Sequence, residues 1–337
     1  MKQSVLVITL LLFTVICASA WWFWKDMQTV LDSPLPANSA RDFTIKPGMS
    51  LQSISYQLKE TGLIKQPYYL VIEARRTRQE GKLKAGEYVI NPGITPRQLL
   101  DQFVIGKVKQ YELTLVEGWT FTQVMEAIGS NTVFTHTLDP ADHTTVMKTL
   151  GYPELAPEGQ FFPDTYHFPR ATTDLDFLQR AFHTLQKVLA EEWEQRAEGL
   201  PYKTPYEALI MASLIERETG LREERTAIAG VFVRRLQKGM KLQTDPAVIY
   251  AMGENFDGNL RSQDLLLDSP YNTYVYAGLP PTPIALPGRD SIQAALHPAD
   301  SDALYFVAKG DGSHHFSATL DEHNKAVARY QLNSSRE

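Results

Sequence analysis

The sequence predicts a mixed α+β fold, with one N-terminal transmembrane helix, a subdomain of strand-turn-helix units and a larger mixed α+β domain. Three observations support this prediction. Residues 4–24 contain no charged side chain, a strand-turn-helix pattern recurs before residue 130, and proline-rich loops alternate with helical patterns from residue 150. The chain has 337 residues and is 43% hydrophobic, so it can form about two domains of ~150 residues with apolar cores.

The composition excludes several classes of protein. The formal net charge of -6 leaves no polycationic surface, so we expect no nucleic-acid partner. The one cysteine, Cys17, excludes an internal disulfide framework and a cysteine-based zinc or iron-sulfur site. His314, His315 and His323 match no common zinc spacing, and the chain has no phosphate-binding glycine loop. The sequence therefore predicts neither a metal nor a cofactor.

Residues 1–25 are predicted to form a short cytoplasmic tip and a membrane anchor. The uncharged run Ser4–Trp24 matches the ~20 apolar residues that a transmembrane helix needs. It ends in the aromatic cluster Trp21–Trp24, which suits a membrane interface, and Lys2 upstream places the N-terminus in the cytoplasm. The alternative is a signal peptide cleaved after Ala18–Ala20. In both cases the rest of the chain is exported.

A spacer is expected over residues 26–42, followed by a repetitive subdomain over residues 43–130. In three copies, an alternating run precedes a Pro-Gly or Glu-Gly turn, and Ser50, Thr95 or Thr120 then occupies a helix N-cap position. Helical apolar spacing follows each cap. This unit resembles the LysM module, which binds N-acetylglucosamine polymers. The alternative is a βα scaffold that binds no ligand.

A second domain is expected over residues 150–333. Prolines within residues 153–169 exclude a long helix there and predict an aromatic-rich loop. An apolar stripe over residues 173–195 predicts a helix. Residues 266–290 form a long loop, which is usually functional in a compact domain, and residues 304–308 are predicted to form a buried strand.

The segment 204–220 carries the most informative carboxylate. It begins with a capping box and a proline, and it ends in glycine, so it predicts a well-bounded helix. Glu218 extends one apolar face of this helix. The apolar residues on that face are Met211, Leu214 and Ile215. A carboxyl group there is partly desolvated, which raises its pKa and suits a general acid. The alternative is a glutamate paired with a nearby arginine.

Five motifs stand out along the chain. They are Phe162–Tyr166, Ala212–Thr219, Leu242–Pro246, Tyr271–Tyr274 and Gly278–Pro281. Each motif alone is weak, but together they are highly specific, and the chain resembles the endolytic murein transglycosylases of the MltG (YceG-like) family. The resemblance implies a lytic transglycosylase that cleaves the β-1,4 MurNAc-GlcNAc bond of nascent peptidoglycan. It also implies 1,6-anhydroMurNAc ends and termination of strand elongation.

The resemblance places the essential glutamate of the family in the Glu-x-Glu of the predicted helix. We assign it to Glu218, while Glu216, on a smaller and more polar line of the helix, is the alternative. One glutamate suffices for lytic transfer because the C6 hydroxyl of the sugar is the nucleophile, whereas a hydrolase needs a second carboxylate. Asp164 and Asp245 are the candidates for that carboxylate, and Asp245 has the alternative role of capping a helix or orienting a sugar hydroxyl.

Further residues are expected to bind the glycan, in part because aromatic faces and amides suit pyranose rings. They are Gln243, Thr244, Tyr271, Asn272, Asp164 and Tyr166. The resemblance also implies a single-pass protein of the inner membrane with its catalytic body in the periplasm, and association with penicillin-binding proteins and other wall-synthesis enzymes. The alternative functions are a muramidase, which hydrolyses the bond, and a non-catalytic glycan-binding scaffold. Glu218 argues against the scaffold, which has no use for a protonatable carboxylate on an apolar face.

Overall fold

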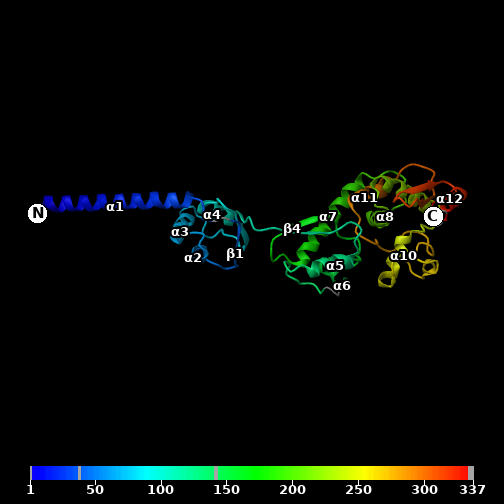
Figure 1. The fold of residues 1–337 in the computed structure, drawn as a ribbon, viewed down its shortest axis with the longest axis horizontal. Helices are drawn as coiled ribbons and strands as arrows, with labels where there is room; N and C mark the ends of the chain where they lie inside the picture. Colours follow the sequence, from blue (N-terminus) through cyan, green and yellow to red (C-terminus); the bar gives the residue numbers. More distant parts are fainter. Residues whose placement is uncertain (1, 37–38, 140–142, 333–337) are drawn as a thin grey trace. The chain divides into compact units, whose positions relative to one another are not determined.

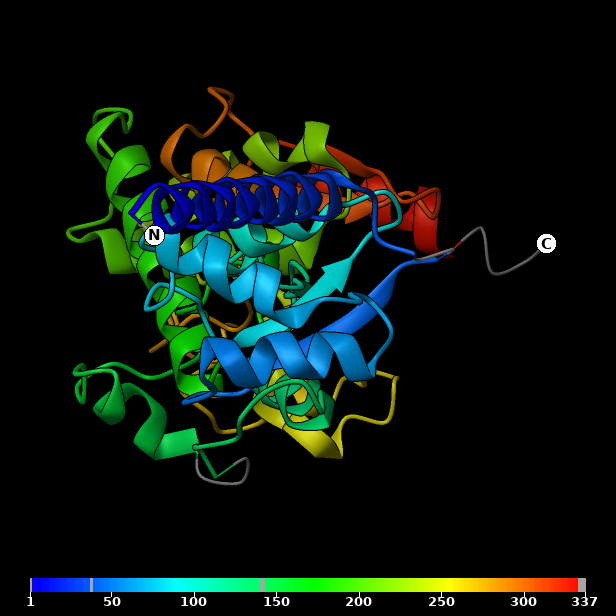
Figure 2. The same ribbon diagram turned by 90° about the vertical axis from the view of Figure 1, so that its left-hand side faces the viewer.

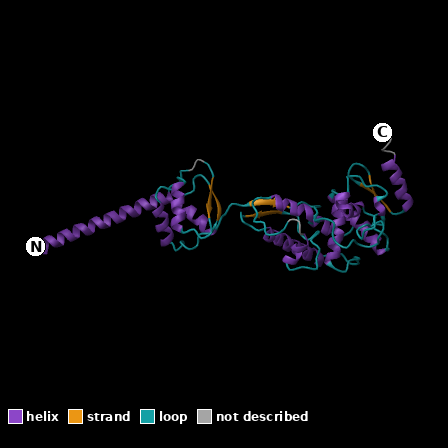
Figure 3. Ribbon diagram, turned by 90° about the horizontal axis from the view of Figure 1, so that it is seen from below, coloured by secondary structure: helices purple, strands orange, loops and turns teal. Residues whose placement is uncertain are grey.

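The computed structural model describes residues 2–36, 39–139 and 143–332. The chain divides into two compact units: unit 1 contains residues 1–111 and 168–170, and unit 2 contains residues 112–167 and 171–337. The described residues form helices and three two-stranded sheets, so the predicted mixed α+β class is confirmed (Figures 1 and 3). Residue 1 of the predicted tip, residues 37 and 38 of the predicted spacer and the predicted domain end at 333 lie outside the described residues.

Unit 1 begins with helix α1 (Lys2–Asp32), which is long and apolar enough to cross a membrane. The helix does not stop where the apolar run ends. Met27 and Leu31 are 0% and 1% exposed and belong to the hydrophobic core of unit 1, together with Leu35. The expected spacer over residues 26–42 therefore begins as a helical part of the core. The physical reason is the four-residue spacing of these apolar side chains, which places them on one face.

The rest of unit 1 is a small sheet with helices packed on it (Figure 2). Strand β1 (Arg41–Ile45) pairs antiparallel with β2 (Gly86–Ile90). The helices are α2 (Leu51–Glu60), α3 (Pro67–Arg76) and α4 (Pro96–Ile105). The predicted caps are confirmed, since Ser50 and Thr95 accept hydrogen bonds from the backbone N–H groups of Ser53 (3.1 Å) and Gln98 (3.2 Å). The LysM-like character of this unit stays a prediction.

The third strand-turn-helix copy has the same local structure but lies mostly in unit 2. Thr120 caps α5 (Phe121–Ser130) with a full capping box. Strand β3 (Tyr111–Thr114) pairs with β4 (Thr165–Phe168). The segment 153–169, expected to be a loop, thus ends in a strand. The backbone pairing of β3 and β4 extends by one more hydrogen bond, because Leu115 N–H donates to the Asp164 carbonyl at 3.0 Å.

Unit 2 is mainly helical, and besides α5 and most of the β3–β4 pair it contains the antiparallel pair of β5 (Tyr305–Ala308) and β6 (His314–Ser317). Its other helices are α6 (His143–Thr149), α7 (Asp174–Glu194), α8 (Pro205–Glu218), α9 (Arg225–Gln237), α10 (Asp245–Met252), α11 (Arg289–Leu296) and α12 (Leu320–Val327). Short 3-10 turns cover Arg222–Glu224, Gly253–Asn255 and Asp264–Leu266, and a π turn covers Ala328–Leu332. The strand predicted at 304–308 is present but only half-buried, because Val307 alone among β5 residues is fully buried.

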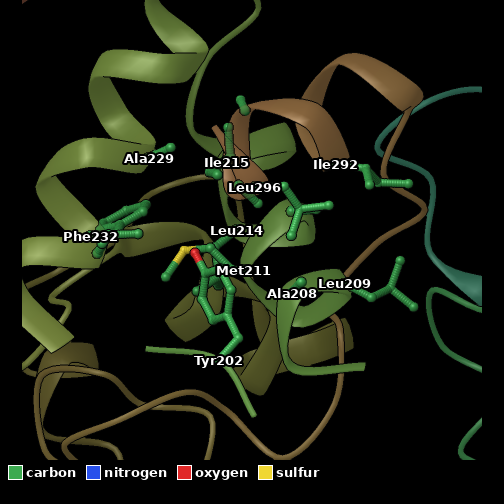
Figure 4. Packing of buried hydrophobic residues seen from close by; sticks show 14 of the residues in the cluster. Tyr202, Ala208, Leu209, Met211, Leu214, Ile215, Ala229, Phe232, Ile292 and Leu296 are labelled. Atoms are coloured by element: carbon green, nitrogen blue, oxygen red, sulfur yellow. The ribbon is translucent and has the colours of Figure 1, made fainter. Parts of the chain in front are cut away.

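Helix α8 is the centre of unit 2 and packs against α7, α9, α10 and α11. Every residue from Ala208 to Ile215 is buried, so the helix is apolar on all sides. Figure 4 shows Met211 and Leu214 among side chains from α9 and α11, including Phe232 and Leu296. Thr204 caps the helix, but the reciprocal arm of the predicted capping box differs, since the Glu207 carboxylate accepts from Lys203 N–H at 2.5 Å. This rigid core positions the last residue of α8, Glu218.

Candidate active site

Glu218 lines a pocket of about 510 Å³ in unit 2, called here the Glu218 pocket. Its wall is assembled from the end of α8, from α9, from the start of α10, from the loop before α11 and from the β5–β6 pair with α12. The polar and aromatic residues on this wall include Glu218, Arg235, Gln243, Asp245, Tyr274, Tyr305, His314 and His323. The pocket therefore combines one helix-end carboxyl with groups from four distant segments.

The protonation of Glu218 is set by its surroundings. Burial raises the pKa of Glu218 to about 7, and the nearby Asp245 carboxylate also raises it. The Thr244 hydroxyl donates to Glu218 Oε2 at 2.7 Å, and this hydrogen bond and the Arg235 charge lower the pKa. A carboxyl with a pKa near 7 is present in both protonation states at neutral pH. Such a group can donate a proton and then accept one.

Thr244 is a buried residue that forms a hydrogen bond with Glu218. Its side chain is 1% exposed, and its backbone N–H donates to Thr273 Oγ1 at 3.0 Å. The sequence reasoning expected Thr244 to contact substrate. The structure places its hydroxyl against the carboxylate of Glu218, so Thr244 contacts the candidate acid directly.

Arg235 holds the loop that carries Gln243. Its guanidinium is nearly buried, and Nη1 donates to the carbonyls of Lys241 (3.1 Å) and Leu242 (2.9 Å) and to Gln243 Oε1 (3.2 Å). Its Nε donates to the Leu304 carbonyl at 2.7 Å. Arg235 thus joins the 241–243 loop to the start of β5. The sequence reasoning missed this residue, although it follows the apolar residues of α9 at helical spacing.

Asp245 lies on the same pocket wall and is held by an aromatic partner. The Tyr274 hydroxyl donates to Asp245 Oδ1 at 2.5 Å. Helix α10 begins at Asp245 itself and Thr244 occupies the N-cap position, so the alternative in which Asp245 caps the helix is wrong. Tyr274 belongs to a quoted motif, but the sequence reasoning did not single it out as a pocket residue.

Glu216 has a structural environment two residues before Glu218. Its side chain is 5% exposed, Arg225 Nη2 donates to Oε1 at 3.1 Å, and the Gly288 backbone N–H donates to Oε2 at 2.9 Å. Gly288 is the N-cap of α11, so this carboxylate joins α8 to α9 and α11. The smaller and more polar line of α8 that precedes Glu216, namely Leu209, Ala212 and Ser213, is as buried as the opposite face of the helix.

Three of the expected sugar contacts hold the backbone instead of lining the Glu218 pocket. The Tyr166 hydroxyl donates to the Phe162 carbonyl at 2.8 Å, and Asp164 Oδ1 accepts from Thr165 N–H at 2.7 Å. Asn272 is 0% exposed, and its amide nitrogen donates to the carbonyls of Leu265 (3.0 Å) and Leu267 (2.8 Å). Its oxygen accepts from the backbone N–H of Tyr274 at 2.9 Å. Asn272 therefore positions Tyr274.

Tyr271 lines a neighbouring cavity of about 860 Å³, called here the Tyr271 pocket. Its ring lies 5.0 Å from that of Tyr250, centroid to centroid. The two pockets adjoin, because consecutive residues line different ones: Arg217 and Pro246 face the Tyr271 pocket, whereas Glu218 and Asp245 face the other.

The Tyr271 pocket contains a carboxyl group that the sequence reasoning missed. Burial raises the pKa of Glu158 to about 7. The Phe121 backbone N–H donates to its oxygens at 3.0 and 3.2 Å, and the Tyr250 hydroxyl donates at 3.2 Å. Glu158 thus caps the start of α5 while also lining the cavity.

The histidines have partners of their own. His314 Nδ1 lies 2.7 Å from Glu224 Oε2, and His323 stacks on Tyr305 with ring centroids 5.2 Å apart. Burial lowers the pKa of His323. Within the part of the chain that the structure describes, no group of three or more His, Cys, Asp or Glu side chains is arranged to hold a metal ion.

Comparison with known proteins decides the family. The YceG-like family matches residues 43–329. The chain belongs to the YceG-like family. The resemblance drawn from the sequence motifs is therefore confirmed.

Three related proteins match this YceG-like chain over most of its length. The endolytic murein transglycosylase of Bacillus subtilis (strain 168) is 33% identical, with 91% of this chain and 86% of that protein covered. That of Streptococcus pneumoniae serotype 2 is 30% identical over 96% of this chain, which spans 65% of its length. The 2.6 Å crystal structure of a putative yceG-like protein from Listeria monocytogenes has a TM-score of 0.55 and 30% identity, covering 86% of this chain and 99% of the other.

Proposed function

We propose that this YceG-like chain is a membrane-anchored lytic transglycosylase that cleaves peptidoglycan within its glycan strands. The observation that carries the proposal is Glu218, a carboxyl with a pKa near 7 at the end of a rigid core helix and on the wall of a pocket. Relatives that match over most of the chain are named endolytic murein transglycosylases.

The reaction needs one group that acts first as an acid and then as a base. Protonated Glu218 donates its proton to the oxygen of the β-1,4 bond, and the bond from that oxygen to C1 of MurNAc breaks. The resulting carboxylate then takes the proton of the MurNAc C6 hydroxyl, whose oxygen attacks C1. The product is a 1,6-anhydroMurNAc end, no water is consumed, and Glu218 ends protonated as it began.

The placement of the other carboxylates favours this route over hydrolysis. A hydrolase needs a second enzyme carboxylate close to the reacting sugar. Of the two expected candidates, Asp164 lies beside β4 with its side chain bonded to Thr165 N–H. Asp245 lines the Glu218 pocket but accepts the Tyr274 hydroxyl. We assign Asp245 to orienting a sugar hydroxyl and to raising the pKa of Glu218.

The two adjoining pockets suit a polymer cut within its length. We assign the sugars at the cleaved bond to the Glu218 pocket, with Gln243 and Asp245 as contacts. We assign sugars farther along the strand to the Tyr271 pocket, where the rings of Tyr250 and Tyr271 offer apolar faces. The LysM-like copies of unit 1 are proposed to hold the strand at a separate place.

The proposed location follows from α1. Its apolar run crosses the inner membrane once, with the N-terminus in the cytoplasm and both units in the periplasm, where nascent peptidoglycan lies. Penicillin-binding proteins and other wall-synthesis enzymes are the proposed partners. Termination of strand elongation is the proposed outcome of the cut.

A pair of variants tests the catalytic assignment. Glu218→Gln is nearly isosteric and removes the transferable proton, so activity on purified glycan strands should fall by roughly 10² to 10⁴ or more while the melting temperature is kept. Glu216→Gln should do the reverse. It weakens the ion pair with Arg225, so it should lower the melting temperature while the folded enzyme stays active.

The products test the reaction class. Mass spectrometry should find products lighter by one water than those of hydrolysis. Reducing ends would make the enzyme a muramidase and give Asp245 a catalytic role. An active Glu218→Gln enzyme with a normal melting temperature would overturn the assignment of the acid.

A further inference from the structure

The C-terminal part of α1 contacts helix α3 within unit 1. The rings of Phe23 and Tyr69 meet edge to face with centroids 5.4 Å apart, and the Arg76 guanidinium lies 5.5 Å from the Trp24 ring. The Tyr69 hydroxyl also donates to Asp26. These contacts lie at the last residues of the apolar run and at the first charged residues after it.

The spacing of these contacts sets the direction of α3. Tyr69 and Arg76 are about 10 Å apart along α3, whereas their partners Phe23 and Trp24 are successive residues, about 1.5 Å apart along α1. Helix α3 therefore crosses α1 at one level and does not run along it. Figure 1 shows α3 at the edge of unit 1 from which the exposed length of α1 projects.

The buried side of α3 faces away from the apolar run. Leu70 and Ala74 belong to the core of unit 1. Glu73 is 1% exposed and is bonded to Arg97, which also donates to Gln28 (2.6 Å) and Asp32 (2.8 Å). Both of these residues follow the apolar run by a turn or more of α1. The exposed side of α3 therefore opens toward the run.

The exposed side of α3 has the composition of a membrane-surface helix. Tyr68 and Ile72 are 45% and 37% exposed. Arg75 follows on the same face, with its side chain 60% exposed and its Nε 3.1 Å from Glu80 Oε1. Exposed Lys65 precedes the helix. An aromatic and an aliphatic side chain flanked by basic residues suit the boundary between lipid headgroups and acyl chains.

We propose that the exposed face of α3 lies on the surface of the membrane that α1 crosses, with Tyr68 and Ile72 at the level of the headgroups and Arg75 and Lys65 beside lipid phosphates. This inference rests on the proposed membrane anchoring. It makes unit 1 a body seated on the bilayer at the level of Trp24.

Fluorophore quenching in lipid vesicles tests the proposal with the full chain. A polarity-sensitive fluorophore is attached to a single cysteine. The protein is reconstituted into vesicles of phosphatidylcholine and phosphatidylglycerol, with or without lipids that carry a quencher either near the headgroup or on the acyl chain. The wild-type chain, labelled at Cys17, reports on the anchor. Cys17→Ser combined with Ile72→Cys reports on α3, and Cys17→Ser combined with Tyr56→Cys is the control, because Tyr56 is 51% exposed on α2.

The expected result is strong quenching at positions 17 and 72 and little at position 56. Adding Arg75→Glu to the Ile72→Cys chain should reduce quenching at position 72, since it places a negative charge against anionic lipid. Quenching at position 17 without quenching at position 72 would overturn the seating of α3 and leave the anchor intact. Absence of quenching at position 17 would overturn both the anchor and this inference.

Discussion

Replacing Thr244 by valine should raise the pKa on which cleavage depends. The change keeps the shape of the side chain and removes the hydroxyl that donates to Glu218 Oε2 at 2.7 Å. That hydrogen bond favours the charged carboxylate, and it opposes the burial that raises the pKa of Glu218 to about 7. Without this hydrogen bond, burial and the Asp245 carboxylate should raise the pKa of Glu218 further.

The size of the effect follows from the hydrogen bond. A hydrogen bond to a charged group contributes about 1.5–3 kcal/mol, and one pKa unit corresponds to about 1.4 kcal/mol. The protonated carboxyl also keeps some interaction with a hydroxyl, so the lower end applies. We expect the pKa of Glu218 to rise by about one unit.

The assay is the release of 1,6-anhydro products from purified glycan strands as a function of pH. The acid form of Glu218 starts the reaction, so the alkaline limb of the kcat/KM profile should move up by about one pH unit in Thr244→Val. Thr244→Ser keeps the hydroxyl and should keep the wild-type limb. An unmoved limb in a folded Thr244→Val enzyme would refute the control of Glu218 by Thr244.

Three further outcomes follow from burial and packing. The pKa values of Glu158 and Glu218 are raised from 4.5 to about 7. The stability that these groups contribute is therefore present below about pH 4.5 and is lost as the pH rises through 7. The melting temperature should fall between these pH values, and it should fall less in Glu218→Gln. Leu31→Ala should cost about 2–5 kcal/mol of unfolding free energy, measured by denaturation in detergent, whereas Leu12→Ala, at a residue 59% exposed on α1, should leave it unchanged. Tyr271→Ala should raise KM for long strands more than it lowers kcat, and Tyr276→Ala, at an exposed tyrosine bonded to Asp268, should change neither.

The parts of the fold that were predictable depend on neighbours in sequence. Ser50, Thr95 and Thr120 are helix caps, and each accepts a bond from a residue three positions ahead. Glu218 likewise continues a face of α8 that is buried as expected. Such patterns are readable because the interacting groups are separated by one turn or less.

The parts that were missed depend on partners far along the chain. Glu216 is buried because Gly288, 72 residues away, donates to it, and Arg235 is held by a carbonyl 69 residues away. Met27 and Leu31 follow the apolar run directly, so hydropathy alone does not separate the lipid-facing part of α1 from its core-facing part. Helical spacing reveals a buried face but not the element that covers it.

Gln243 in the Glu218 pocket has a consequence for how this protein can be changed. Its φ angle is 53°, in the left-handed region that costs a non-glycine residue about 1–2 kcal/mol, and Arg235 holds it there. Glycine would relieve that cost, but it would remove the amide from the pocket wall and the hydrogen bond to Arg235. Glycine recovered at this position after laboratory selection for heat resistance would therefore mean that the backbone cost outweighs the hydrogen bond, whereas selection for wall cleavage should retain glutamine.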